Sequence, residues 1–254
     1  MVYNLSRRAM VCIAALAAAS MSATPICLAA EKEDQPAALQ VELFDAIDAG
    51  QVDVKFIPRD STKANVLIQN LTDQPLELEL PDAFAGVPVL AQMGGMGMGG
   101  GGMGGMGGGG FMRVAPERMR KLAVTTVCLE HGKPEPNPKM AYKIVPLEQF
   151  TTNAEVRVVC EALGHGQVTQ KSAQAAAWHL MDDMSWSELA AKNRVESKYT
   201  GNVRWFSPIE LRTAMAVVRE AARVVEMRSE EESSSESESG YDEEYDTSYA
   251  GDKG

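Results

Sequence analysis

Motifs for common hydrolases and for nucleotide binding are absent from these 254 residues. There is no G-x-S-x-G motif, which presents a serine nucleophile, and no H-E-x-x-H motif, which supplies two zinc ligands. The one glycine-rich run leads into Phe111-Met112-Arg113-Val114, without the lysine and hydroxyl residue that complete a phosphate loop. We therefore predict no catalytic residue and no cofactor, and we expect a protein that is not an enzyme.

Positive charge is scarce, and long apolar segments are missing beyond the N-terminus. The stretch from Ser229 to Gly254 has ten acidic residues and one lysine, so it carries −9 of the formal net charge of −11. Nucleic-acid binding needs a basic face, which this composition argues against. No segment after the first thirty residues is long and apolar enough for a membrane span, so we expect none in the mature chain.

Residues 1–30 have the pattern of a cleavable signal peptide. Arg7 and Arg8 precede an uncharged apolar stretch over residues 9–23, and small residues at 29–30 are followed by a charged segment. This order is typical of secretory signals. We predict a secreted or periplasmic protein.

Residues 31–150 are predicted to form an Ig-like antiparallel β-sandwich. Apolar side chains alternate with polar ones in several short runs, and a period of two indicates strands with one buried face. The clearest runs start at Val52, Ala64 and Leu76, and others lie at 121–129 and 142–145. A short helix is expected around 41–49. The Met/Gly-rich segment 92–112 is predicted to be a flexible loop between strands.

Residues 151–228 are predicted to be helical, which makes the fold class α+β. Capping boxes are predicted at Thr152, Ser185 and Ser207, each followed three residues later by glutamate. All three tryptophans lie in this region and are expected in its core. Residues 229–254 combine high charge with no apolar period, so we expect a disordered acidic tail.

Only two cysteines, Cys128 and Cys160, follow the predicted signal peptide. Two cysteines in an exported protein most often pair. The predicted disulfide would close a loop of about thirty residues and contribute about 3–4 kcal/mol in the chain-entropy model.

Two metal sites are alternatives. Thioether sulfur favours Cu(I), and the Met/Gly run offers five methionines at short spacings: Met93, Met96, Met98, Met103 and Met106. A second donor set of two sulfurs and two nitrogens, suited to tetrahedral zinc, consists of Cys128, His131, Cys160 and His165.

Three motifs carry a family resemblance: V-C-L-E-H-G-K-P-E-P over 127–136, Q-A-A-A-W-H-L over 174–180 and S-W-S-E-L-A over 185–190. Together they resemble uncharacterised exported proteins of planctomycete-type bacteria. The resemblance covers roughly residues 124–191. It implies export, and it implies no activity.

A third hypothesis for Cys128 is that it forms an internal thioester with Gln174. The segment Ala173–Trp178 is similar to the T-Q-x-A-like motif of Gram-positive thioester adhesin domains, with Ala173 where threonine is usual. That resemblance implies attack of a cysteine on the glutamine carbonyl, loss of ammonia and later capture of an amine. The sequence thus predicts an exported binding or structural protein with an unknown protein or cell-surface partner. A covalent adhesin and a copper- or zinc-binding protein are the alternatives.

Overall fold

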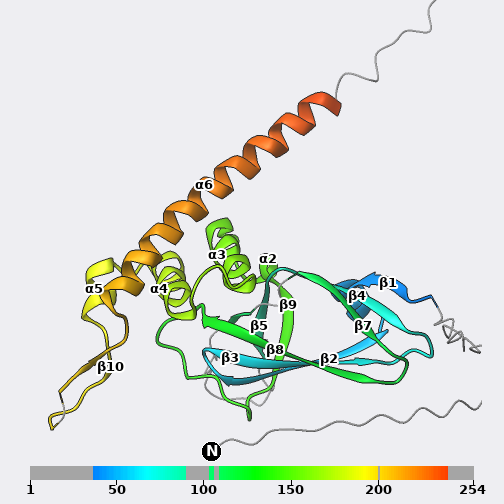
Figure 1. Cartoon of the computed structure of the whole chain (residues 1–254), viewed down its shortest axis with the longest axis horizontal. Coiled ribbons are helices and arrows are strands. Elements are labelled where there is room, and N and C mark those ends of the chain that lie inside the picture. Colours follow the sequence, from blue (N-terminus) through cyan, green and yellow to red (C-terminus); the bar gives the residue numbers. More distant parts are fainter. Residues whose placement is uncertain (1–36, 90–102, 106–108, 200, 240–254) are drawn as a thin grey trace, which may run out of the picture. The chain divides into compact units, whose positions relative to one another are not determined.

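The computed structural model describes residues 37–89, 103–105, 109–199 and 201–239 of the chain (Figure 1). The predicted signal peptide, most of the Met/Gly run and residues 240–254 lie outside these ranges. The described part has a mixed α+β fold with mostly antiparallel sheets. Its elements are, in order, β1 Leu39–Glu42, α1 Leu43–Asp48, β2 Val52–Asp60, β3 Lys63–Asn70, β4 Leu76–Leu80, β5 Phe84–Pro88, β6 Met103–Gly105, β7 Gly110–Val114, β8 Met119–Cys128, β9 Tyr142–Pro146, α2 Leu147–Phe150, α3 Ala154–Gly164, α4 Gln170–Met181, α5 Trp186–Ala191, β10 Asn193–Val195, β11 Val203–Arg204 and α6 Pro208–Ser239.

Six strands close into a barrel in the order β2-β3-β8-β6-β5-β9. Every pairing around this barrel is antiparallel, as the alternating pattern predicted. The predicted Ig-like sandwich is not confirmed, because these strands belong to one closed sheet instead of two packed sheets. The predicted strands at 52, 64, 76, 121 and 142 are confirmed, and so is the helix near 41–49, as α1.

A separate three-stranded sheet has the order β1-β4-β7, and Figure 1 shows these strands side by side. β1 runs parallel to β4, whereas β7 runs antiparallel to it. Leu76 and Leu78 of β4 are fully buried, and they alternate with Glu77 and Glu79, which are more exposed. The period of two in this strand therefore marks its buried face correctly.

Aromatic side chains form part of the core of the sheets. Phe56 contacts Phe84 edge to face with ring centroids 6.0 Å apart, and it lies 5.9 Å from the ring of Tyr142. Gly86 of β5 passes directly over this cluster, since a Cβ atom added there would stand 2.8 Å from Cε1 of Phe56. Only glycine leaves room for the phenylalanine ring at this crossing.

The prediction that residues 92–112 form one loop is wrong in two places. Met103–Gly105 form β6, which lies between β5 and β8 and completes the barrel. Gly110–Met112 belong to β7. The backbone of this glycine-rich segment pairs with neighbouring strands. Such pairing needs no side-chain pattern, so a search for alternating apolar residues does not detect it.

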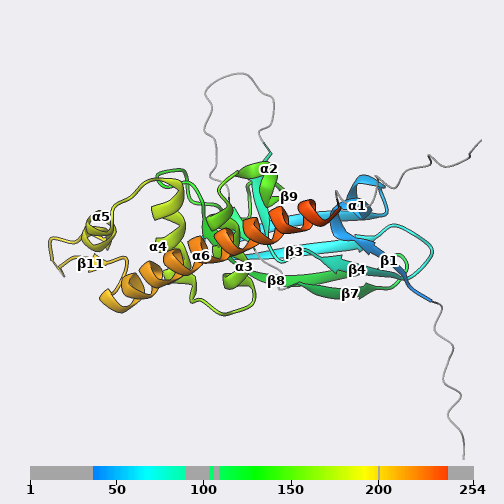
Figure 2. The same cartoon turned by 90° about the horizontal axis from the view of Figure 1, so that it is seen from above.

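The helices share one core with the barrel. Buried Val156 and Cys160 of α3, Ala175 of α4 and Ala214 of α6 pack in a cluster that also contains Val127 of the barrel strand β8. Figures 1 and 2 show α6 beside α3 and α4. The described strands and helices accordingly belong to one compact unit. All three tryptophans join this cluster as predicted, and Trp178 is the most deeply buried of them.

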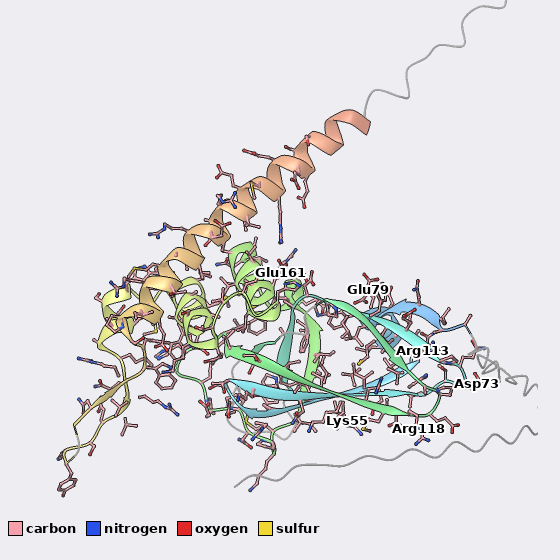
Figure 3. All side chains as sticks on the ribbon, viewed as in Figure 1. Lys55, Asp73, Glu79, Arg113, Arg118 and Glu161 are labelled. Atoms are coloured by element: carbon pink, nitrogen blue, oxygen red, sulfur yellow. The ribbon has the colours of Figure 1, made fainter. Side chains whose placement is uncertain are left out.

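An ion pair joins α3 to α6 outside this core. Arg228 of α6 lies 2.8 Å from the carboxylate of Glu161, the α3 residue labelled in Figure 3. The glutamate side chain is largely buried, so solvent screens this pair less than it screens a fully exposed one.

Helix capping follows the predicted signals with one shift. Ser185 and Glu188 form the predicted capping box at the start of α5. Ser207 and Glu210 exchange the same two hydrogen bonds at the start of α6. At α3 the cap is Asn153 instead of Thr152, because the asparagine side chain accepts from the main-chain N–H groups of Glu155 and Val156.

The predicted disordered tail is wrong for residues 229–239, which continue α6. Ser229, Ser233 and Ser234 each donate their hydroxyl to the carbonyl three residues earlier. Glutamate has a high helix propensity, and extending an existing helix needs no new nucleation. Among the helices within the described ranges, none combines the length and the apolar character needed to cross a bilayer.

Asn70 provides a stability test of the fold. Its fully buried amide donates to the carbonyls of Gln74 and Val114 and accepts from the N–H and hydroxyl of Thr72. Asn70→Ala should therefore lower the free energy of unfolding by about 3 kcal/mol in urea denaturation, because buried partners lose their bonds.

The matched control is Asn65→Ala, at a half-buried position of the same strand. It should change stability by less than about 1 kcal/mol. Equal losses in the two variants would contradict the anchoring role of Asn70.

Candidate functional site

The side-chain amide of Gln174 pairs with the main chain of Cys128. The amide oxygen accepts from the Cys128 N–H at 2.8 Å, and the amide nitrogen donates to the Cys128 carbonyl at 2.7 Å. Gln174 is only 3% exposed, although it is polar. Two residues 46 positions apart are thus held face to face by two short hydrogen bonds.

Local structure explains why glutamine is needed here. β3 pairs with β8 as far as Lys63 and Thr125, and β8 then extends beyond β3 to Cys128. Thr126 and Cys128 present their main-chain groups to the same edge, because alternate residues of a strand do so. Gln170 of α4 donates to the Thr126 carbonyl at 3.1 Å, and Gln174, one turn later, pairs with Cys128. The two glutamines continue the hydrogen bonding that β3 leaves unfinished.

The predicted Cys128–Cys160 disulfide is wrong, because both residues are thiols in the structure. The Cys128 sulfur donates to the Glu130 carbonyl at 3.1 Å. Cys160 instead packs inside the shared core, where burial raises the pKa of its thiol to about 12. A thiol that buried is almost entirely protonated at neutral pH and reacts poorly.

The Cys128 thiol is half-buried. Burial is the largest influence on its pKa and raises it, while the main chain of Glu130 and the indole N–H of Trp178 act in the opposite direction. Gln174 and Trp178 lie four residues apart on α4, so they share one helix face. Cys128 therefore has an amide carbonyl and an indole N–H as neighbours.

The predicted zinc set is also wrong. Its four residues are engaged separately: Cys160 lies in the core, and His165 pairs with Asp82 at 3.2 Å. Within the described ranges, no three His, Cys, Asp or Glu side chains converge as a metal site would require. For the copper prediction, Met93, Met96, Met98 and Met106 lie outside those ranges, and for Met103 the structure describes the main chain only.

His131 follows Cys128 closely and is held by three groups. Its N–H donates to both carboxylate oxygens of Asp182 at 3.0 Å, and its ring meets Trp178 edge to face at 4.9 Å. Nε2 lies 2.7 Å from Nζ of Lys192, so the lysine ammonium donates to a neutral imidazole that carries its proton on Nδ1. Burial and the lysine charge lower the pKa of His131, while Asp182 opposes them.

A cavity of about 490 Å³ borders Gln174 on the side of the β2–β3 turn. Its walls carry acidic, basic and hydroxyl side chains from both the barrel and the helices. The lining residues are Asp60, Ser61, Thr62, Glu135, Gln170, Lys171, Gln174, Arg194 and Trp205. A small polar molecule or a side chain of a partner can approach the Gln174 amide from this cavity.

Sequence reasoning paired Cys128 with Gln174 as one alternative but missed two neighbours. Asp182 lies just after the end of α4, and its carboxylate accepts from the main-chain N–H of His131. Lys192 stands over the rings of Trp178 and Trp205 at 5.3 and 5.4 Å. No local motif marks such contacts. His179 has a separate partner, since its Nδ1 lies 2.8 Å from the Met184 carbonyl.

Comparisons of the chain with protein-family models, with curated proteins and with solved structures found no match. The two resemblances drawn from short motifs therefore stay predictions, and the site is interpreted from its own geometry.

His131 gives a pH prediction. Its folded pKa lies below the ordinary value of 6.5, so the unfolded chain takes up a proton at a pH at which the folded protein does not. This residue should therefore reduce the free energy of unfolding as the pH falls below 6.5. NMR titration of the imidazole should give a midpoint under 6.5, and Lys192→Met should raise it by removing the neighbouring charge. A midpoint that Lys192→Met leaves unchanged would contradict the contact.

Proposed function

We propose that Cys128 and Gln174 form an internal thioester and that this protein uses it to attach itself covalently to a partner. The observation that carries the proposal is the pairing of the buried Gln174 amide with the main-chain N–H and carbonyl of Cys128, at 2.8 and 2.7 Å. This geometry fits a covalent adhesin better than a metal-binding protein, and it gives a specific mechanism to the predicted exported binding protein.

The reaction has two steps. First, the Cys128 sulfur attacks the amide carbon of Gln174; an S–C bond forms, the C–N bond breaks, and the thiol proton leaves with the nitrogen as ammonia. In the second step, a primary amine attacks the thioester carbon. An amide bond then forms, the C–S bond breaks, and the Cys128 thiol regains a proton. No oxidant or reductant is required, and each molecule reacts once.

Proximity is the main contribution of the fold to the first step. An amide is a poor acyl donor, and holding it beside the nucleophile replaces a bimolecular encounter with an intramolecular one. Gln174 is 3% exposed, so burial limits the contact of the acyl group with bulk water and slows hydrolysis of the product. The cavity beside Gln174 supplies an approach for the amine.

The state of the cysteines fits this proposal. In an oxidising compartment an accessible thiol is readily oxidised or crosslinked. Cys160 is protected by burial, whereas Cys128 is only half-buried. A thioester would block the Cys128 sulfur until a target amine arrives, which gives an exported protein a reason to keep two unpaired cysteines.

The proposed partner is a protein or cell surface that presents primary amines, such as lysine side chains. The cavity wall carries the carboxylates of Asp60 and Glu135 and the cations of Lys171 and Arg194, so an approaching polar side chain meets groups of both signs. Export through the N-terminal segment remains part of the proposal, because the partner surface lies outside the cell.

Intact mass of the exported full-length protein tests the proposal. The thioester form should be lighter than the processed sequence by one ammonia per chain. Methylamine treatment should then add one methylamine and expose one thiol. Cys128→Ala and Gln174→Glu should each abolish the ammonia loss, because either change removes one reacting group.

The matched control is Gln170→Glu, one turn earlier on the same helix face, where the partner is the carbonyl of Thr126 instead of a cysteine. It should keep the ammonia loss. A wild-type mass equal to that of the unmodified sequence would reject the thioester and leave Gln174 as a structural link between helix and barrel.

A further inference from the structure

Trp178 carries a buried N–H donor that makes no hydrogen bond of normal geometry. Its side chain is 5% exposed, and its indole Nε1–H has no hydrogen-bond partner among the residues that the structure describes. Most buried indole N–H groups find a partner, and an unpaired one costs free energy. In the resting amide form this N–H lies near the Cys128 sulfur, which is a weak acceptor, so the donor is available to a stronger one.

The place of this donor is defined by α4. Trp178 follows Gln174 by four residues on the same face of the helix, and its ring packs on His131, Trp205 and Phe206. The indole is thus fixed by aromatic contacts on several sides. Its N–H also lowers the pKa of the Cys128 thiol, so the indole lies close to the Cys128 sulfur.

We infer that the Trp178 indole N–H stabilises the oxyanion that develops on the Gln174 acyl oxygen when the thioester forms and when an amine opens it. The inference rests on the proposed thioester and adds a residue to its chemistry. In both steps the carbonyl carbon becomes tetrahedral and its oxygen gains negative charge. A fixed donor in a largely buried site stabilises that charge without having to reorient.

The same contact explains why the donor is unpaired in the amide form. The Gln174 oxygen is then occupied by the N–H of Cys128. When sulfur bonds to the amide carbon, the acyl group is joined to Cys128 Sγ, near which the indole lies. The acceptor becomes accessible to Trp178 only along the reaction, so the interaction is stronger in the transition state than in the starting state.

The test uses the full-length exported protein and Trp178→Phe, which keeps an apolar ring but removes the N–H. Intact mass followed over time should show opening by methylamine slowed about 100-fold, the effect typical for loss of one oxyanion donor. The control variant is Trp186→Phe, because the Trp186 ring packs on His179, with ring centroids 4.3 Å apart. This variant should react at the wild-type rate. Circular dichroism checks that both variants are folded.

A second measurement tests the same contact without the variant, in case Trp178→Phe does not fold or forms no thioester. In wild-type protein with ¹⁵N-labelled tryptophan, the Trp178 indole signal should move downfield and exchange more slowly in the thioester form than after methylamine opening. The Trp186 signal should stay in place, since that indole is not part of the site.

The outcomes separate the two proposals. A wild-type thioester whose opening rate is the same in folded Trp178→Phe overturns the role of Trp178 and leaves the thioester intact. The same holds if the Trp178 indole signal is unchanged between the two forms. A wild-type protein without ammonia loss overturns the thioester, and the role of Trp178 with it.

Discussion

The two hydrogen bonds between the Gln174 amide and the Cys128 main chain are the interaction on which this arrangement depends. They occur where β8 extends beyond β3, and they let a helix satisfy strand groups that would otherwise be buried without partners. Unpaired main-chain groups are costly in a core, so the position of α4 against the barrel is tightly specified. His131 and Trp178 are placed by the same contact between helix and strand.

This constraint gives one residue two roles. As an amide, Gln174 completes the hydrogen bonding of β8; as an acyl donor, it would react with the residue to which it is bonded. The neighbouring Gln170 shows the structural role alone, because its partner is Thr126. Both glutamines bond to the main chain of β8, but only Gln174 has a cysteine as its partner. The proposed chemistry therefore depends on the cysteine at position 128.

Much of the fold was predictable from residue patterns. The alternation in β2, β3 and β4 identified strands, and the Ser-x-x-Glu pairs located the starts of α5 and α6. Closure of the barrel was not predictable, because β6 is Met-Gly-Gly and β5, Phe-Ala-Gly-Val-Pro, has no alternation of apolar and polar residues. The acidic continuation of α6 was missed because composition was read as disorder, although glutamate and serine can extend a helix already anchored in the core.

The site was predictable only in part, for the same physical reason. The short motif around Gln174 pointed to Cys128, and the structure brings these residues together. The disulfide prediction relied only on the expected oxidising compartment. It did not consider that Cys160 faces the shared core from α3. Contacts such as Lys192 with His131 join residues 61 positions apart and depend on how the helices pack. No local spacing encodes them.

A high-resolution crystal structure of the exported protein tests the central claim most directly. The account predicts continuous electron density between Sγ of Cys128 and the side-chain carbonyl carbon of Gln174, with no nitrogen on that carbon. Separate side chains, with an intact amide still bonded to the Cys128 main chain, would contradict it.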